Sequence, residues 1–521
     1  PPALTRTMAS AHGKDDRCGA AGDDVCEVLI VGGGLMGVTL GVLLKKLEPD
    51  WNIVLCEGSG ACGEGNSNSC FQGCMANAGY CELRYTTEVE KSDKTPYGIK
   101  SSKALKTNED FQLCKELWGY LCNEKLINND WIQPVPHMCF ATGSENVDFL
   151  RRRYNTLKQH SGFEGMQMSE NANEINAWAP LLFEGRSLDE ECIGATVTPQ
   201  GTNVDFGMLT KQLAGAFVKL GGVLLTHHTV TDIRKDETHC TWECVGETPS
   251  AGGSSFQKHA RFVFISAGPR TLPMLKHVGL TQVSRHICAP VPTSFLVCDK
   301  PDIVKQLQAK VYFVLDFKHA PKAGQPVLEC RTIDGKQNIS FGPFAEFSAS
   351  GCWEAAKIMN LQDMCASLCT GICNPKTTAY MFGIGTSTKE SKMAVLKRVL
   401  PSANSDDWTV VKGATAMAIT HENEPAAKYT YSFSTEVVFD SGRGLGGVFG
   451  ACPPSAFSVR ASFKFLLKAF EDKIPGWRPL LEKMVPSFRL YDASREAWGS
   501  LEEHPQLAAE IRQRAALDLG I

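Results

Sequence analysis

The chain has 521 residues, of which 43% are hydrophobic and 21% charged, and this composition excludes a disordered or fibrous protein and predicts a globular one with two or more domains. Its formal net charge of −4 at pH 7 supplies no basic surface, so we expect no nucleic-acid partner. No apolar run reaches the ~18 residues that suggest a membrane-spanning helix. The 21 cysteines lack the paired spacing of a metal site, so we expect free thiols in a reducing compartment.

The first segment of the chain, residues 1–24, is small, polar and rich in Gly and Ala. Because it has no hydrophobic periodicity, we expect a disordered leader. The chain starts with Pro rather than Met, which either a trimmed organellar presequence or an incomplete N-terminus explains.

The most informative segment runs from Glu27 to Glu57. An apolar run leads into three glycines in G-x-G-x-x-G spacing, which are Gly32, Gly34 and Gly37. A helix-periodic run follows, and a second apolar run ends at Glu57. In a βαβ unit that binds a dinucleotide, the first glycine permits a tight turn, the second lets the backbone approach the pyrophosphate, and the third lets the helix pack on the sheet. A terminal carboxylate then accepts hydrogen bonds from the ribose hydroxyls, so this segment predicts a dinucleotide-binding site.

The rest of the chain contains both helical and strand-like patterns. Helices are predicted at 108–126, 146–160, 205–220, 353–367, 389–399, 454–470 and 502–515. Strands are predicted at 222–234, 260–266, 292–298, 310–315, 328–342 and 435–450. The later strands alternate and are joined by turns, which favours an antiparallel sheet. Residues 245–257 are predicted to form a flexible hairpin loop.

Two later segments favour FAD over NAD as the dinucleotide. Residues 261–269 form an apolar strand that ends in a turn at Gly268, where a flavoprotein chain crosses under the dinucleotide. Residues 445–456 place a strand of small residues, with Gly450 and Ala451 at its end, before a helix that starts with prolines. A helix N-terminus directed at the flavin would stabilise the negative charge of the reduced ring. We therefore predict an FAD site built from both ends of the chain.

These patterns predict an α/β plus α+β fold, with a Rossmann-like FAD-binding domain and an inserted substrate domain built on an antiparallel sheet. The expected division of the chain is a leader at 1–24, a discontinuous FAD-binding domain at 25–95, 200–285 and 430–475, a substrate domain at 96–199 and 286–429, and a C-terminal helical segment at 476–521.

The chain resembles the FAD-dependent malate:quinone oxidoreductases over nearly its whole length. The segments that carry the resemblance are GVLLKKLEPDW (41–51), CELRYT (81–86), PVPHMCF (134–140), WAPLL (178–182), GTNVDFGMLT (201–210), FLVCDKP (295–301), IDGKQNISFGPFAEFS (333–348) and TEVVFDS (435–441). The resemblance implies oxidation of malate to oxaloacetate in the tricarboxylic acid cycle, with electron delivery to a membrane quinone and without a nicotinamide. It also implies peripheral contact with a membrane or a membrane complex, here the matrix side of the mitochondrial inner membrane, and it places Asn77 and Gly79 beside FAD.

Four segments depart from the usual pattern of that family, all near the expected active site. They are 66–80, 269–270, 326–329 and 452–455. In the third, Val327 stands where a histidine is usual, while Arg331 is kept. Two alternatives therefore stand beside the malate enzyme: a non-catalytic FAD-binding accessory or scaffold subunit, and a dehydrogenase for another 2-hydroxy acid.

Malate oxidation needs a base for the 2-hydroxyl proton and cations for two carboxylates. Arg331 is the expected carboxylate clamp, because a guanidinium binds a carboxylate through two N–H groups; the alternative is a salt-bridged arginine. His137 is either a base, a carboxylate donor or a structural core histidine. Arg84 and Arg270 either supply a further cation or fill the pocket. The nearest candidates for membrane contact are the arginine run at 151–153 and the helix at 454–470.

Overall fold

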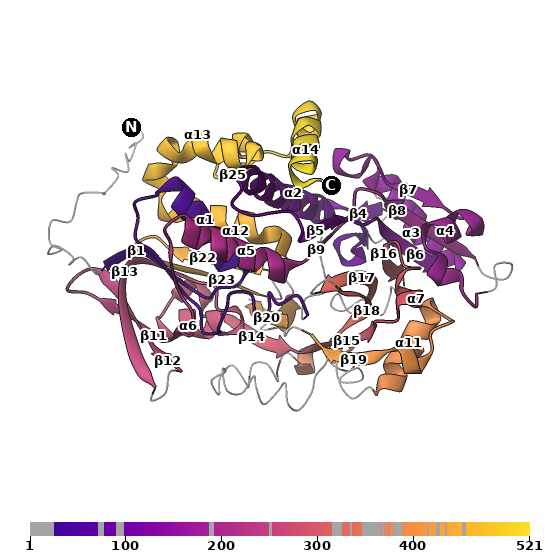
Figure 1. Cartoon of the computed structure of the whole chain (residues 1–521), viewed down its shortest axis with the longest axis horizontal. Helices are drawn as coiled ribbons and strands as arrows, with labels where there is room; N and C mark the ends of the chain where they lie inside the picture. Colours follow the sequence, from indigo (N-terminus) through magenta and orange to yellow (C-terminus); the bar gives the residue numbers. More distant parts are fainter. Residues whose placement is uncertain are drawn as a thin grey trace, which may run out of the picture.

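The computed structural model places two large sheets side by side, with the C-terminal helices packed along one side of the molecule (Figure 1). It describes residues 25–70, 78–89, 98–186, 192–249, 253–314, 326–333, 336–345, 371–376, 388–413, 416–423, 428–432, 435–450 and 455–521, and the single positions 365, 369 and 379. The leader predicted at 1–24 lies outside these residues, as does all but one residue of the helix predicted at 353–367.

The first sheet, which we call the nucleotide sheet, is parallel at its centre. Its strands are β1 (Val25–Val31), β2 (Ile53–Cys56), β10 (Val223–Leu225), β11 (Thr229–Asp236), β12 (Thr241–Thr248), β13 (Ser254–Ile265), β22 (Thr435–Asp440) and β23 (Leu445–Gly450). β10, β2, β1, β13 and β23 follow one another in parallel, whereas β11 and β12 join β13 in an antiparallel meander. This arrangement confirms the Rossmann-like part of the predicted fold.

The helix after β1 is covered on all sides. α1 (Leu35–Leu47) has apolar residues around its whole circumference, as expected of a helix in the interior. It packs against α5 (Phe206–Lys219) and α12 (Ser458–Ala469). Gly41 permits the close approach of α5, since a Cβ atom there would stand 3.0 Å from the ring of Phe217. α1 is thereby held with its N-terminus at the end of β1.

The second sheet, which we call the substrate sheet, has the order β19-β15-β18-β17-β16-β6-β8-β7. Its strands are β6 (His137–Thr142), β7 (Gln167–Ser169), β8 (Ile193–Thr198), β15 (Thr293–Cys298), β16 (Lys310–Val314), β17 (Val327–Ile333), β18 (Lys336–Ala345) and β19 (Thr409–Lys412). The predicted antiparallel pairing holds for every neighbouring pair except β6 and β16, which run parallel. β6 and β16 are joined by a long crossover of chain, which parallel neighbours require.

The remaining strands form smaller sheets. They are β14 (His286–Val291) with β20 (Ala416–Asn423) and β21 (Lys428–Ser432), β3 (Thr87–Val89) with β4 (Gly98–Lys100), β5 (Ile132–Pro134) with β9 (Thr202–Val204), and β24 (Tyr491–Asp492) with β25 (Ala497–Trp498). The loop predicted at 245–257 is shorter than expected, because β12 extends to Thr248 and β13 begins at Ser254.

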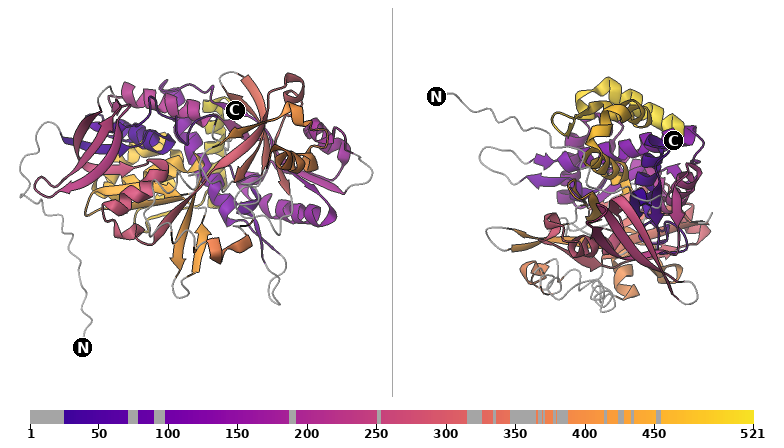
Figure 2. Two further views of the ribbon diagram at one scale, coloured as in Figure 1. Left: turned by 90° about the horizontal axis from the view of Figure 1, so that it is seen from below. Right: turned by 90° about the vertical axis from the view of Figure 1, so that its left-hand side faces the viewer.

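The other helices are α2 (Ser102–Asn123), α3 (Ser144–Leu157), α4 (Ala172–Trp178), α6 (Thr271–His277), α7 (Pro301–Val304), α11 (Lys389–Val399), α13 (Ile474–Met484) and α14 (Pro505–Leu519). Within the part of the chain that the structure describes, none of the helices is long and apolar enough to cross a membrane. Figure 2 shows that the β11–β13 meander and the substrate sheet lie at opposite ends of the molecule.

Helix α2 holds α12 and the C-terminal segment through three carboxylates, of which Asp110 and Glu116 are buried. Asp110 accepts a hydrogen bond from Nε of Arg460 at 2.7 Å. Glu116 accepts two, from the backbone N–H and the hydroxyl of Ser487, each at 2.7 Å. Glu109 accepts from the hydroxyl of Ser500 at 2.6 Å. The contacts of Glu116 and Glu109 fasten residues 476–521 to α2, and the contact of Asp110 fastens α12 to it.

The carboxyl group of Glu116 makes stability dependent on pH. Burial raises its pKa from the model-peptide value near 4.5 to about 7, in spite of the two hydrogen bonds from Ser487. A raised pKa in the folded state means that folding favours the protonated carboxyl group. The contribution of Glu116 to the free energy of unfolding is therefore complete below about pH 4.5 and is lost as the pH rises through 7. We expect Glu116→Gln to abolish this loss, which amounts to roughly 3 kcal/mol.

The measurement is the urea midpoint of the holoprotein at pH 5, 6, 7 and 8. Glu109→Gln is the matched control, because it also contacts the C-terminal segment but leaves Glu116 in place. Equal pH dependence in Glu116→Gln and the unmodified protein would contradict the assignment to this carboxyl group.

Candidate functional site

The turn after β1 packs too closely against neighbouring backbone to admit side chains at Gly32 and Gly37. Gly32 has a φ of +105°, and a Cβ atom there would stand 2.5 Å from the carbonyl oxygen of Ser266. Gly34 is the N-cap of α1 and has an extended backbone. Gly37 lies so close to the turn that a Cβ atom would stand 2.1 Å from the carbonyl oxygen of Gly32. The three glycines therefore occupy the positions that the sequence pattern predicts.

Glu57 closes the same site from the end of β2. Its two carboxylate oxygens accept separate hydrogen bonds, from the backbone N–H of Gly33 and from that of Ser59, each at 2.7 Å. A carboxylate oxygen accepts more than one hydrogen bond, so both oxygens keep capacity for ribose hydroxyls. The backbone contacts fix the orientation in which the carboxylate meets the ligand.

A cleft of about 450 Å³ connects these groups with the later segments. Its walls include the predicted contacts Gly32, Gly34, Glu57, Gly268 and Gly450, together with Ser67, Ala267 and Arg270. Gly79 does not line it; a Cβ atom at Gly79 would stand 2.4 Å from the carbonyl oxygen of Ala104. The predicted contacts Asn77 and Ala451 lie outside the described residues.

The cleft fits the elongated dinucleotide that the sequence predicts. Gly32 and Gly37 allow the turn to pack closely against neighbouring backbone, and the N-terminus of α1 lies at the end of β1, where a phosphate would be stabilised. Residues from both ends of the chain, Val31 and Phe449 among them, line the same cleft. These features support a site for FAD assembled from separate segments.

We expect Glu57→Gln to weaken FAD binding while the fold is kept. The amide nitrogen would face a backbone N–H, and one charge-assisted hydrogen bond to the ribose would be lost, which costs about 1.5–3 kcal/mol. The dissociation constant of FAD should rise about tenfold to a hundredfold.

The test is titration of the apoprotein with FAD, in which quenching of the flavin fluorescence reports binding. Glu64→Gln is the control, because Glu64 lies in the following loop but is exposed and does not line the cleft. Equal affinity in the Glu57 and Glu64 variants would refute the ribose assignment.

A second polar region covers one face of the substrate sheet. Thr198, His137, Lys310, Glu329 and Ser340 lie side by side on five neighbouring strands. All five side chains are buried. The opposite face is apolar and forms a core with Met138, Phe140, Val311, Phe313, Leu328, Ile339 and Phe341. Because successive residues of a strand point to opposite faces, this alternation separates a polar face from a packing face.

Three charged side chains of this polar face contact one another. Nζ of Lys310 lies 2.9 Å from Oε2 of Glu329, and Nε of Arg331 lies 2.8 Å from Oε1. Burial alone would raise the pKa of Glu329, but Lys310 and Arg331 outweigh it and lower the pKa to about 2. The guanidinium of Arg331 also stacks over the ring of Phe295, 4.5 Å from its centroid. Arg331 is thus both salt-bridged and held in a fixed orientation.

His137 lies next to this trio with one ring nitrogen engaged. Its Nε2 atom lies 2.9 Å from the carbonyl oxygen of Thr202, which is an acceptor only, so Nε2 carries the proton and donates. Nδ1 is buried and has no hydrogen-bond partner among the described residues. Burial, with a further effect from the charge of Lys310, lowers the pKa of His137 to about 3. The ring is therefore neutral, and Nδ1 presents a lone pair.

Aromatic side chains border the polar face. The ring of Tyr80 packs edge-on against His137 at 5.9 Å. Tyr312 donates a hydrogen bond from its hydroxyl group to Oε1 of Glu82 at 3.4 Å. Arg84 donates to the hydroxyl of Tyr85 at 3.1 Å. Of the two arginines considered as extra cations, Arg84 lies by these aromatic groups, whereas Arg270 lines the dinucleotide cleft.

The comparison with known families settles what kind of protein carries these two regions. The family described as malate:quinone oxidoreductase (Mqo) matches residues 24–521. The chain belongs to the malate:quinone oxidoreductase family. This confirms the family resemblance and the enzyme class predicted from the sequence, and with them FAD as the cofactor.

Curated relatives give the same result over nearly the full length. A probable malate:quinone oxidoreductase of Halalkalibacterium halodurans is 34% identical over 502 residues, which cover 95% of this chain and 97% of that protein. One from Lysinibacillus sphaericus is 34% identical over 498 residues, covering 93% and 96%. Both relatives are bacterial.

Solved structures show the same fold at low sequence identity. L-α-glycerophosphate oxidase of Mycoplasma pneumoniae, solved with FAD bound, has a TM-score of 0.54 at 16% identity and covers 85% of this chain and 94% of its own. Glycine oxidase of Geobacillus kaustophilus has a TM-score of 0.51 at 17% identity, covering 86% and 95%. The two-sheet architecture of this malate:quinone oxidoreductase family member is therefore that of FAD-dependent oxidoreductases.

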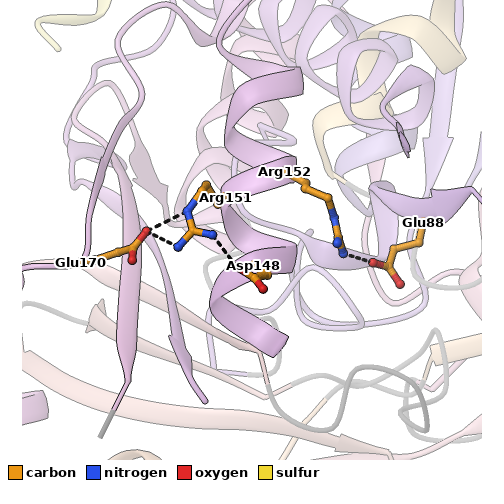
Figure 3. Close-up of polar contacts among 5 residues, drawn as sticks. All are labelled: Glu88, Asp148, Arg151, Arg152 and Glu170. Carbon is orange, nitrogen blue, oxygen red and sulfur yellow. Dashed lines mark hydrogen bonds and ion pairs between the residues drawn. The ribbon is translucent and has the colours of Figure 1, made fainter. Parts of the chain in front are cut away.

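The arginine run considered for membrane contact is neutralised in the structure (Figure 3). Arg151 pairs with Glu170 at 2.7 Å and with Asp148, and Arg152 pairs with Glu88. Arg153 is fully buried and donates to the carbonyl oxygen of Tyr80 at 2.7 Å. The other candidate, predicted at 454–470, is mostly buried as α12. The run at 151–153 thus forms no unpaired basic patch.

Lys310 and Glu329 are the charged residues of the polar face that the sequence motifs did not single out as site residues. The available signal was local: Lys310 opens an otherwise apolar strand, and Glu329 and Arg331 alternate on β17. Residues two apart on a strand share a face, so the pair was recognisable as charged residues on one side of a buried strand. Among the described residues, no group of His, Cys, Asp and Glu has the arrangement of a metal site.

Proposed function

We propose that this chain oxidises malate to oxaloacetate with FAD as its cofactor and a quinone as the electron acceptor. The observation that carries the proposal is the buried polar face of the substrate sheet. There the oriented guanidinium of Arg331 on β17 and the neutral imidazole of His137 on β6 lie on the two sides of β16, and one imidazole nitrogen is unengaged among the described residues. The family membership supplies the substrate and acceptor that this chemistry serves. When bound in the cleft, FAD supplies the hydride acceptor.

Arg331 binds a substrate carboxylate in this proposal. Its Nε atom is occupied by Glu329, while Nη2 is buried and has no hydrogen-bond partner among the described residues. A buried N–H group without a partner is costly, so an incoming carboxylate oxygen completes an unfinished set of contacts. The stacking of the guanidinium on Phe295 keeps it in place before the substrate arrives.

His137 takes the proton of the 2-hydroxyl group. The hydrogen bond from Nε2 to the carbonyl of Thr202 fixes the tautomer, which leaves Nδ1 as the basic atom. The low pKa keeps the imidazole unprotonated at physiological pH. Binding of an anionic substrate beside the ring raises its proton affinity, because a nearby negative charge favours the imidazolium. The base is therefore strengthened when the substrate is present.

The cellular location remains a prediction. Peripheral contact with a membrane or a membrane complex follows from the need to reach a quinone, and the matrix side of the mitochondrial inner membrane is the predicted compartment. The curated relatives named above are bacterial and support no mitochondrial location.

The decisive experiment is anaerobic mixing of the purified holoprotein with excess malate while the flavin absorbance is recorded. We expect bleaching of the flavin band within seconds, and reoxidation when a soluble quinone is added. Lactate serves as the matched 2-hydroxy acid with one carboxylate, and dithionite reports whether the flavin is reducible. A flavin that dithionite reduces, but that malate, lactate and every other 2-hydroxy acid tried leave oxidised, would overturn the proposal in favour of the accessory-subunit alternative. Reduction by another 2-hydroxy acid but not by malate would overturn it in favour of a dehydrogenase for that acid.

A further inference from the structure

The trio Lys310, Glu329 and Arg331 contains two cations and one carboxylate. Their side chains are 0%, 3% and 2% exposed, so water screens them little. Burial of charged groups is favourable only when partners compensate the lost hydration. Two of the three charges compensate each other here, so the trio has a formal charge of +1.

The carboxylate of Glu329 is divided between the two cations. Oε1 accepts from Nε of Arg331, and Oε2 lies against Nζ of Lys310. The hydroxyl of Ser340 lies 3.4 Å from Oε1 and adds a third contact. Each oxygen is thus fixed by a different neighbour, and the carboxylate cannot rotate without breaking an ion pair.

This arrangement fixes the orientation of the Arg331 guanidinium. Glu329 engages the guanidinium through Nε rather than through its two terminal nitrogens, while Phe295 covers the flat face of the group. Nη2 keeps its donors without a partner among the described residues, although the atom is buried. Side-on engagement through Nε therefore orients the guanidinium and still leaves a terminal nitrogen for a second carboxylate.

We propose that Glu329 and Lys310 are positioning residues, with Glu329 orienting the guanidinium of Arg331 toward the substrate carboxylate and Lys310 holding Glu329 in that orientation. Neither touches the substrate. The inference rests on the proposed function, in which Arg331 binds that carboxylate. It assigns roles to two residues whose interactions would otherwise count only as structural ion pairs.

The first variant is Glu329→Asp, which keeps the charge but shortens the side chain by one methylene, so that the carboxylate no longer reaches both cations. We expect the KM for malate to rise about tenfold to a hundredfold, the range for loss of one charge-assisted contact, with a smaller change in kcat. The second variant is Lys310→Met. It leaves Glu329 and Arg331 as an ion pair with no net charge, so it carries less risk of unfolding than a change to Glu329. Its KM should rise by about threefold to tenfold.

A matched control comes from another buried ion pair of the same chemistry. Asp110 accepts from Nε of Arg460 at 2.7 Å, and the two side chains are 8% and 9% exposed. Asp110→Asn should lower the melting temperature but leave the KM for malate unchanged. FAD content and melting temperature, measured for every variant, separate loss of folding from loss of positioning.

Arg331→Lys distinguishes failure of this inference from failure of the proposed function. If Arg331→Lys leaves the KM unchanged, Arg331 does not bind substrate and the proposed role fails. If Arg331→Lys raises the KM while Glu329→Asp and Lys310→Met leave it unchanged, the positioning inference alone is wrong. Combining Glu329→Asp with Arg331→Lys should raise the KM no further than Arg331→Lys does, because both act through one guanidinium. Fully additive effects would overturn the inference.

Discussion

His137→Gln should lower kcat/KM for malate by about 10²–10⁴-fold, the usual contribution of one positioned acid–base group. The substitution is chosen to keep the structural contact of the histidine. The amide nitrogen of glutamine reaches the position of Nε2 and donates to the carbonyl of Thr202, whereas the lone pair of Nδ1 is lost. Steady-state dye reduction with malate provides the measurement.

The control for this variant is His137→Asn, which places an amide oxygen near Nδ1 but gives up the contact with Thr202. If the histidine serves only to fill the core, His137→Asn should be the more damaging change and His137→Gln nearly silent. A loss of less than tenfold in His137→Gln, with FAD content unchanged, would show that Nδ1 is not the base.

Gly37→Ala should yield a protein that is purified largely without FAD. The new Cβ atom would lie 2.1 Å from the carbonyl oxygen of Gly32 and 2.8 Å from Oγ of Ser266. A backbone oxygen cannot move aside alone, so α1 must shift away from the turn that faces the phosphates. We expect FAD affinity to fall more than a hundredfold, together with a lower urea midpoint.

Gly215→Ala supplies the control on the neighbouring helix. Nothing lies within 4 Å of a Cβ atom at Gly215, and alanine is favoured over glycine inside a helix by about 1 kcal/mol. This variant should bind FAD normally and be slightly more stable. Retention of full FAD occupancy by Gly37→Ala would contradict the close packing at the turn.

The nucleotide site was predictable from sequence because its determinants are local. Gly32, Gly34 and Gly37 occupy fixed positions in one turn, and Glu57 ends the next strand. Gly32 has a positive φ, and a Cβ atom at Gly32 or Gly37 would collide with neighbouring backbone, so these two glycines report the local conformation directly. Gly268 and Gly450, predicted from flanking strands, also line the cleft.

The charged trio was not predictable in the same way. Arg331 and Glu329 share one face of a single strand, but the contact of Glu329 with Lys310 depends on how β16 and β17 align. A shift of one residue in that register would move Lys310 or Glu329 to the opposite face. The intervening sequence does not encode the register in any local pattern. Likewise, Glu116 resembles an ordinary helix residue until Ser487 is brought against it.

The parallel strands of the nucleotide sheet also bear on how the protein is made. Val28 pairs with Phe262, and Val263 pairs with Leu445, so each of these two strand pairs joins segments that lie far apart along the chain. Contacts of such high sequence separation form slowly, and their apolar strands stay uncovered meanwhile. During synthesis, β1 and β2 leave the ribosome long before β23 exists. Flavin capture must therefore follow release of nearly the whole polypeptide, and the half-formed sheet is the stage most in need of a chaperone.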